Sequence, residues 1–196
     1  MVATNKSFWA GVVLSPLLIA VIWLAANKPK VELSQPQPPV ATFDFIPTTD
    51  KVILPTASFE KLSLVDGTTS TVTFADLSDK PMIIHYWATW CGACVEEMPA
   101  LARFAEQNSD NIRFVIIASD HSGGREVKAY CDKNGIKNID VYIDKKGGVL
   151  KAQGIKALPT TVFAGADQTE AGRVVGAIDW SGQSGAIIQG YLTKGA

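Results

Sequence analysis

Residues Met82-Ile-Ile-His-Tyr-Trp-Ala-Thr-Trp-Cys-Gly-Ala-Cys-Val-Glu-Glu-Met-Pro99 join an apolar run, a Cys-x-x-Cys pair and the start of a helical pattern. The run from 82 to 87 is rich in β-branched and aromatic residues and has no formal charge, which predicts a strand buried on both faces. Cys91 follows where this strand gives way to a helix, and the unpaired N–H groups of a helix N-terminus favour thiolate over thiol. Cys94 lies three residues further on the same helix face, so the two thiols can form a disulfide.

This pair has the minimum equipment for thiol–disulfide exchange, namely one nucleophilic thiol and one resolving thiol. A Cys-x-x-Cys also forms half of many zinc sites, but zinc needs about four ligands. The remaining candidate ligands are Cys131, His85 and His121, and they show no paired spacing. The pattern therefore favours a redox dithiol without a metal or cofactor, and a zinc site or a purely structural disulfide are the alternatives.

The sequence around the cysteines resembles a known family. Trp87-Ala-Thr-Trp-Cys-Gly-Ala-Cys94 resembles a thioredoxin-fold active site. The following Glu96-Glu-Met-Pro-Ala-Leu101 narrows this resemblance to the TlpA/ResA/CcmG group of membrane-anchored bacterial thiol:disulfide oxidoreductases, with TlpA-like proteins the most similar. Ala157-Leu-Pro-Thr-Thr-Val-Phe163 is similar to the second hallmark of the superfamily, a proline before an apolar strand.

The resemblance implies roles for residues on both sides of the dithiol. Pro159 would be the cis-proline that lies against the cysteines, whereas a strand-initiating proline is the plainer alternative. Leu158 would then offer its backbone to an incoming peptide. Trp90, Gly92 and Ala93, beside the nucleophile, are expected to contact the substrate as well.

Glu97 and His85 are candidates for proton transfer. Glu97 follows Cys94 by three residues, so it can point inward, where a partly buried carboxylate has a raised pKa and could take the Cys94 proton. The alternative for Glu97 is a solvated helix carboxylate without a role. His85 stands six residues before the first cysteine, where thioredoxin itself has a buried aspartate. It is a possible proton relay, with an ordinary pKa of about 6.5, or a core histidine with satisfied hydrogen bonds.

The N-terminal part of the chain predicts a membrane anchor. After a short tail (residues 1–7), residues 8–26 carry no charged side chain and have Trp9 and Trp23 near their ends. A helix of this length spans about 28 Å, close to the hydrocarbon thickness of a bilayer. We expect a single uncleaved transmembrane helix, with a cleaved signal peptide as the alternative. The resemblance implies that it holds the protein in a bacterial inner membrane with the following domain in the periplasm.

The rest of the chain predicts a linker and one folded domain. Residues 27–54 are expected to form a Pro-rich linker whose last apolar residues could dock on the head, and residues 55–196 a thioredoxin-like domain. This domain should begin with a β-hairpin whose turn is Asp66-Gly67. The expected order is a hairpin (59–64 and 69–74), the motif strand, a helix to about 107, a strand (112–118), a helix (126–133), three strands (141–143, 161–163 and 173–178) and a helix (184–192). This order predicts an α/β sandwich with a mixed sheet.

Composition limits the class of protein. The 196 residues carry a formal net charge of −1 without basic runs, which argues against a nucleic-acid partner. Two of the three cysteines are in the motif, so the fold depends on its own core and not on a framework of disulfides. We expect a monomeric head, Cys131 as a small buried hydrophobe and His121 as a loop residue.

Taken together, these features predict a thiol:disulfide oxidoreductase that acts on disulfides of partner proteins. The Cys91 thiolate would attack the partner, and Cys94 would resolve the mixed disulfide. The resemblance implies a reductase for copper-oxidase assembly factors or apocytochrome c, recharged by a membrane thiol donor of the DsbD or CcdA kind. The Gly-Ala dipeptide fits this direction, because it lacks the cationic group that would stabilise the thiolate of a strong oxidant.

Other activities known for this fold are disfavoured because the sequence lacks the motifs or segments that they need. A Sco-like copper-binding assembly protein uses Cys-x-x-x-Cys with a distant histidine, whereas this chain has Cys-x-x-Cys. A DsbA-like oxidase or DsbC-like isomerase would need a helical insertion or a dimerisation region. A peroxiredoxin would need a Pro-x-x-x-Thr-x-x-Cys segment, which the sequence lacks.

Overall fold

The computed structural model describes residues 44–180 and residue 188. The expected anchor at 8–26, the tail before it and most of the expected linker lie outside the described residues, as does the expected last helix except for Ile188, which is helical and buried. Within the described part of the chain, no helix is long and apolar enough to cross a membrane.

One mixed sheet organises the described residues, with the strand order β1-β8-β7-β4-β5-β6-β2-β3. Strand β4 lies inside this sheet, antiparallel to β7 and parallel to β5, and all six of its residues are buried. Burial on both faces explains its unbroken apolar run. The strands are β1 (Phe45–Pro47), β2 (Phe59–Leu62), β3 (Thr69–Val72), β4 (Met82–Trp87), β5 (Arg113–Ala118), β6 (Val141–Ile143), β7 (Thr160–Ala164) and β8 (Glu170–Val175).

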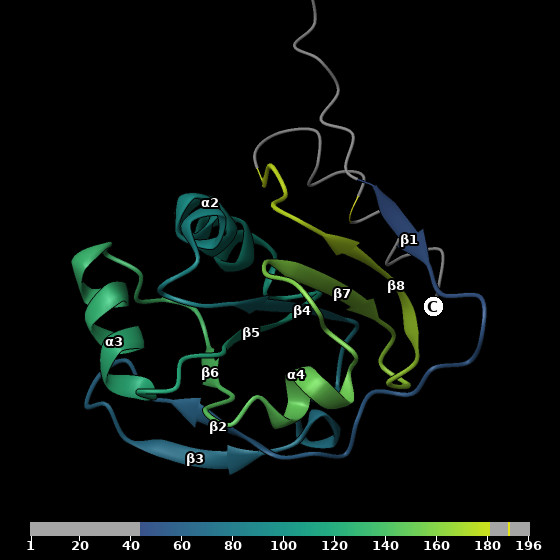
Figure 1. Ribbon diagram of the computed structural model, residues 1–196, viewed down its shortest axis with the longest axis horizontal. Coiled ribbons are helices and arrows are strands. Elements are labelled where there is room, and N and C mark those ends of the chain that lie inside the picture. The colour runs from purple at the N-terminus through teal and green to yellow at the C-terminus, as the bar shows by residue number, and fades with distance from the viewer. Residues whose placement is uncertain (1–43, 181–187, 189–196) are drawn as a thin grey trace, which may run out of the picture. The chain divides into compact units, whose positions relative to one another are not determined.

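Helices cover both faces of the sheet (Figure 1). Successive β4 residues point to opposite faces, so Ile83 and Trp87 join one core cluster with Met98, while Ile84 and Tyr86 join the other. The first cluster lies under α2 (Gly92–Asn108) and α3 (Gly124–Lys133), and the second under η1 (Phe74–Leu77) and α4 (Gly148–Ala152). The predicted thioredoxin-like α/β sandwich with a mixed sheet is therefore confirmed.

The predicted N-terminal hairpin is present. Strands β2 and β3 pair antiparallel, with Phe59 opposite Val72. Asp66 accepts a hydrogen bond from the Thr68 N–H, and Gly67 adopts a φ of 77°, a conformation that glycine takes without steric cost. Beyond this hairpin, β2 pairs with β6 and so extends the central sheet.

Three features differ from the sequence expectation. Within the expected linker, Phe45–Pro47 forms β1, which pairs with β8 at the sheet edge and places Phe45 against Phe163. The last strand ends at Val175 and not at residue 178, because Gly176 leaves the strand with a φ of 106°. The short helices η1 and α4 were not expected. Elements of three to five residues are too short to show a hydrophobic period.

Candidate active site

The two motif cysteines form a disulfide where β4 passes into α2. Their Cα atoms are 5.2 Å apart. Cys91 is the N-cap of α2 and is partly exposed, whereas Cys94 is fully buried. The Cys91 sulfur accepts a hydrogen bond from the Cys94 N–H at 3.3 Å. Cys91 is thus the sulfur that a partner can reach, and its position at the helix N-terminus favours the thiolate.

Asp120, for which the sequence predicted no role, holds the loop before Cys91. Asp120 is buried just after β5, and its carboxylate accepts hydrogen bonds from the backbone N–H of Thr89, at 3.1 Å, and from the Thr89 hydroxyl. The Cys91 N–H donates to the carbonyl of Ala88 at 3.1 Å. A lone aspartate after a strand carries no sequence signal for this role, since its partner is 31 residues away.

Leu158 and Pro159 directly precede β7, and Leu158 lines a cavity together with Cys91. The Leu158–Pro159 peptide bond is cis, as the resemblance implies, and the Thr160 hydroxyl donates to the Ala157 carbonyl at 2.8 Å. Together with Trp90, which is 66% exposed, Leu158 and Cys91 line this cavity of about 370 Å³. Its other lining residues are Ser119, Leu150, Ile155, Lys156 and Ala157. Gly92 and Ala93 are exposed on the first turn of α2 but do not line this cavity.

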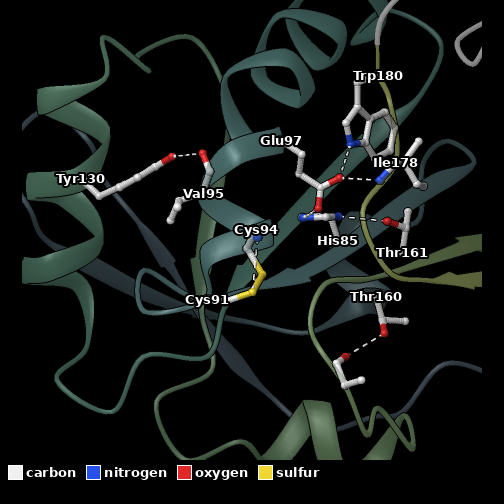
Figure 2. Close-up of polar contacts among 11 residues, drawn as sticks. His85, Cys91, Cys94, Val95, Glu97, Tyr130, Thr160, Thr161, Ile178 and Trp180 are labelled. Atoms are coloured by element: carbon white, nitrogen blue, oxygen red, sulfur yellow. Dashed lines mark hydrogen bonds and ion pairs between the residues drawn. A yellow bond between two sulfur atoms is a disulfide. The ribbon is translucent and has the colours of Figure 1, made fainter.

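Glu97 points inward from α2, as its spacing from Cys94 predicts (Figure 2). Its Oε2 accepts hydrogen bonds from the Ile178 N–H at 2.8 Å and from the Trp180 indole N–H at 2.9 Å. Burial raises the pKa of Glu97 to about 7, although these two donors oppose the shift. The carboxyl therefore has a proton affinity suited to exchange near neutral pH, and its part in catalysis stays a prediction.

His85 is fully buried in β4, beside Glu97. Its Nδ1 lies 3.0 Å from the hydroxyl oxygen of Thr161, the residue opposite it on β7. Its Nε2 lies 3.6 Å from Oε1 of Glu97. Burial lowers the pKa of His85 to about 3, so the imidazole is neutral at neutral pH. His85 is thus a buried core residue whose Nδ1 is paired, but its Nε2 has no hydrogen bond among the described residues, and its proposed proton relay stays a prediction.

The family of the chain follows from comparison with known proteins. The Redoxin family matches residues 47–178. The chain belongs to the Redoxin family. This match, with the relatives below, confirms the predicted resemblance to thioredoxin-fold oxidoreductases.

Individual relatives of this Redoxin-family chain match part of its length. The thioredoxin-like protein YneN of Bacillus subtilis is 30% identical over 110 residues, which are 55% of this chain and 58% of that protein. The thiol-disulfide oxidoreductase ResA of Oceanobacillus iheyensis is 32% identical over 127 residues, which are 63% of this chain and 57% of that protein. The match thus spans less than two thirds of either relative. The crystal structure of the exposed lipoprotein thioredoxin of Streptococcus pneumoniae has a TM-score of 0.55 at 24% identity, over 69% of this chain and 98% of that one, which shows a shared fold.

The remaining polar candidates lie apart from the dithiol chemistry. Cys131 is buried on α3, as expected, and burial raises the pKa of its thiol to about 11. His121 is exposed in the loop after β5. Among the residues that the structure describes, no group of three or more His, Cys, Asp or Glu side chains could hold a metal ion.

Ile178 and Trp180 are site residues for which the sequence predicted no role. They follow Glu97 by 81 and 83 residues, and they reach it because the chain leaves β8 at Gly176 and passes alongside α2 (Figure 2). Trp180 also packs against Phe104 of α2. No local sequence pattern signals their contact with Glu97, because the partners lie 81 and 83 residues apart in the chain.

Proposed function

We propose that this protein is a thiol:disulfide oxidoreductase that reduces disulfides in partner proteins. The observation that carries the proposal is the Cys91–Cys94 disulfide at the N-terminus of α2, in which Cys91 is reachable and Cys94 is buried. Relatives named thiol-disulfide oxidoreductase ResA support it. In the reduced protein, the same arrangement supplies a nucleophile and a protected resolving thiol.

The reaction has two exchange steps. The Cys91 thiolate attacks one sulfur of the partner's disulfide, a Cys91–partner disulfide forms, and the other partner sulfur leaves as a thiolate that takes a proton. Cys94 then gives its proton to Glu97 and attacks the Cys91 sulfur, so that the Cys91–Cys94 disulfide forms and the second partner thiolate leaves. The partner's disulfide gains two electrons, which the dithiol loses.

The cavity beside Cys91 is the proposed place for the partner's chain. A peptide that lies against Leu158 and Pro159 would bring its disulfide to Cys91, and the backbone of Leu158 would pair with it. The exposed indole of Trp90 would supply apolar contact. Gly92 and Ala93 would leave the approach to Cys91 free of bulky side chains.

The cellular setting of the proposal rests on the sequence. The apolar segment 8–26 would anchor the protein in a bacterial inner membrane, with the dithiol domain in the periplasm. A membrane thiol donor of the DsbD or CcdA kind would return two electrons to the disulfide. The proposed clients are copper-oxidase assembly factors or apocytochrome c, whose cysteines must be reduced before they bind copper or haem.

Trapping and a redox equilibrium test this proposal with the full-length protein in mild detergent. Reduced Cys94→Ser should accumulate a mixed disulfide with a disulfide-containing peptide, while Cys91→Ser should form none and Cys131→Ser should behave as the unaltered protein. Equilibration with glutathione should give a potential near or below about −230 mV for the Cys91–Cys94 couple. Reaction of Cys91→Ser at the unaltered rate would overturn the activity, and a potential above about −150 mV would overturn the reductase direction.

A further inference from the structure

Two buried polar atoms face each other behind the dithiol without another partner. Oε1 of Glu97 and Nε2 of His85 are 3.6 Å apart, and in the described part of the chain neither has a hydrogen bond to any other group. An unpaired buried polar atom is destabilising, because it has lost its hydrogen bonds to water without replacing them. The 3.6 Å gap is longer than a hydrogen bond, so a small side-chain rotation is needed before one proton between the two atoms can pair both of them. Either atom can carry that proton, because a neutral imidazole has its proton on Nδ1 or on Nε2.

The second oxygen of Glu97 and the second ring nitrogen of His85 limit where this proton can be. Oε2 of Glu97 already accepts from the Ile178 N–H and the Trp180 indole, so the proton of the acid form belongs on Oε1. Nδ1 of His85 lies 3.0 Å from the Thr161 hydroxyl, which can donate or accept. The His85 ring can therefore reverse its hydrogen bonds at both nitrogens.

The surroundings keep the imidazole neutral. The neighbours of the pair are the Cys91–Cys94 disulfide on α2, Thr161 on β7, and Ile178 and Trp180 after β8 (Figure 2). Among the described residues, the ion-pair contact of each member is with the other, and Asp179, between Ile178 and Trp180 in the sequence, is an exposed residue. Burial therefore governs both groups, and it lowers the pKa of His85 while it raises that of Glu97.

We propose that His85 is the positioning residue of Glu97 and pairs with Oε1 in both protonation states of the carboxyl by changing its tautomer. With Glu97 protonated, Oε1–H donates to Nε2 and Nδ1–H donates to the Thr161 oxygen. With Glu97 ionised, Nε2–H donates to Oε1 and the Thr161 hydroxyl donates to Nδ1. The ring carries one proton in each state, and the acid form holds its extra proton on Glu97. An aspartate at residue 85 would instead place two carboxylates face to face.

This inference deepens the proposed function and rests on it only for the use of the Glu97 proton in exchange. Its test is the side-chain ¹⁵N spectrum of the oxidised, full-length protein in mild detergent, from about pH 5 to about pH 9. The chain has two histidines, so His121→Gln identifies the His85 signals. We expect His85 to stay neutral and its ring proton to move from Nδ1 to Nε2 as pH rises through the Glu97 titration, and this response to vanish in Glu97→Gln.

A single His85 tautomer over the whole range, or an imidazolium spectrum near neutral pH, would overturn the proposal. The measurement needs no turnover, so a protein with the tautomer response but without exchange activity would contradict the proposed function alone.

Two His85 variants separate pairing from packing. His85→Phe keeps a ring but removes both nitrogens, whereas His85→Gln keeps an amide that can donate or accept. We expect His85→Phe to move the pH midpoint of the resolving step upward by about one pH unit, a tenfold change in proton affinity, because the Glu97 carboxylate loses a donor. His85→Gln should restore most of this shift. Equal shifts in both variants, or a His85→Phe shift that persists in a Glu97→Gln background, would assign His85 a structural role only.

Discussion

Three separate parts of the chain together determine the proton affinity of Glu97. Helix α2 carries it, β4 places His85 beside it, and the segment after β8 supplies the N–H groups of Ile178 and Trp180. Burial alone would raise the pKa of this carboxyl further than to about 7, because the two donors stabilise the ionised form. The proton affinity of Glu97 is therefore a balance between burial and two specific hydrogen bonds.

Removal of one donor should disturb this balance. Trp180→Phe keeps an aromatic ring beside Phe104 but removes the indole N–H that donates to Oε2. A hydrogen bond to a charged group contributes about 1.5–3 kcal/mol, and part of it is lost when the group is neutral, so we expect the Glu97 pKa to rise by about one unit. The ¹³C shift of the Glu97 carboxyl carbon, followed against pH in the oxidised protein, measures this change.

Trp87→Phe is the matched control for this prediction. Trp87 belongs to the same core cluster as Trp180, and its indole N–H has no hydrogen-bond partner among the described residues. The substitution removes an equivalent N–H without touching Glu97, so the Glu97 titration should stay in place. An equal rise in both variants would show that ring size, and not the hydrogen bond, sets the proton affinity.

Strand β1 packs on β8 at a position that only glycine fits. A Cβ added at Gly172 would lie 2.7 Å from the carbonyl oxygen of Ile46 and would overlap the ring of Phe45. The Phe45 ring in turn packs edge-on against Phe163 of β7. Strand β1 can thus pack closely on β8 only because residue 172 has no side chain, so the packing of β1 depends on β8.

Gly172→Ala should therefore weaken the β1 edge. We expect a loss of about 1–3 kcal/mol in the free energy of unfolding, because the added methyl group overpacks a closed contact. Urea unfolding measures the loss, and faster amide exchange at Phe45 and Ile46 would locate it at β1. In the control Gly148→Ala, the added Cβ meets only one atom, at 3.9 Å, so stability should hold or rise slightly. A Gly172→Ala protein as stable as the control would contradict this close packing.

The His85–Glu97 pair also shapes the pH dependence of stability for the whole molecule. Folding raises the pKa of Glu97 from 4.5 to about 7, so its contribution to stability is complete below pH 4.5 and is lost as pH rises towards 7. Folding lowers the pKa of His85 from 6.5 to about 3, so its contribution is complete above pH 6.5 and is lost as pH falls towards 3. Between pH 4.5 and pH 6.5 the two slopes cancel.

We therefore expect a plateau in the stability difference between the unaltered protein and His85→Phe/Glu97→Gln. Urea unfolding of both full-length proteins should show a constant difference from pH 4.5 to pH 6.5. The difference should fall on both sides, by about 2 kcal/mol towards pH 3. Carboxylates elsewhere with lowered pKa, such as Asp66, cancel because both proteins contain them. A difference that rises steadily through the plateau would show that only one member of the pair is shifted.

Local sequence was sufficient for the parts of the fold that depend on neighbouring residues. Three such parts are the apolar run of β4, the cysteines at the start of α2 and the Asp66-Gly67 turn. Each could be predicted from a few neighbouring residues, because strand burial, helix termini and tight turns depend on local sequence. The cis Leu158–Pro159 bond was expected from the family resemblance. Local patterns failed for β1, whose three residues carry no period and gain order from contact with β8 and β7.

The sequence alone thus predicted the dithiol, Cys91 as the attacking and Cys94 as the resolving thiol, and an acidic residue one helical turn after Cys94. The environment of that acid came from tertiary packing, which brings Ile178 and Trp180 to Oε2 and His85 to Oε1. These contacts span 12 to 83 residues, and none follows a helical or strand period. The proton affinity of a carboxyl group depends on its burial and on the hydrogen-bond donors near it, and both are properties of the packed interior. The identity of a nucleophile, by contrast, follows from the residue type alone.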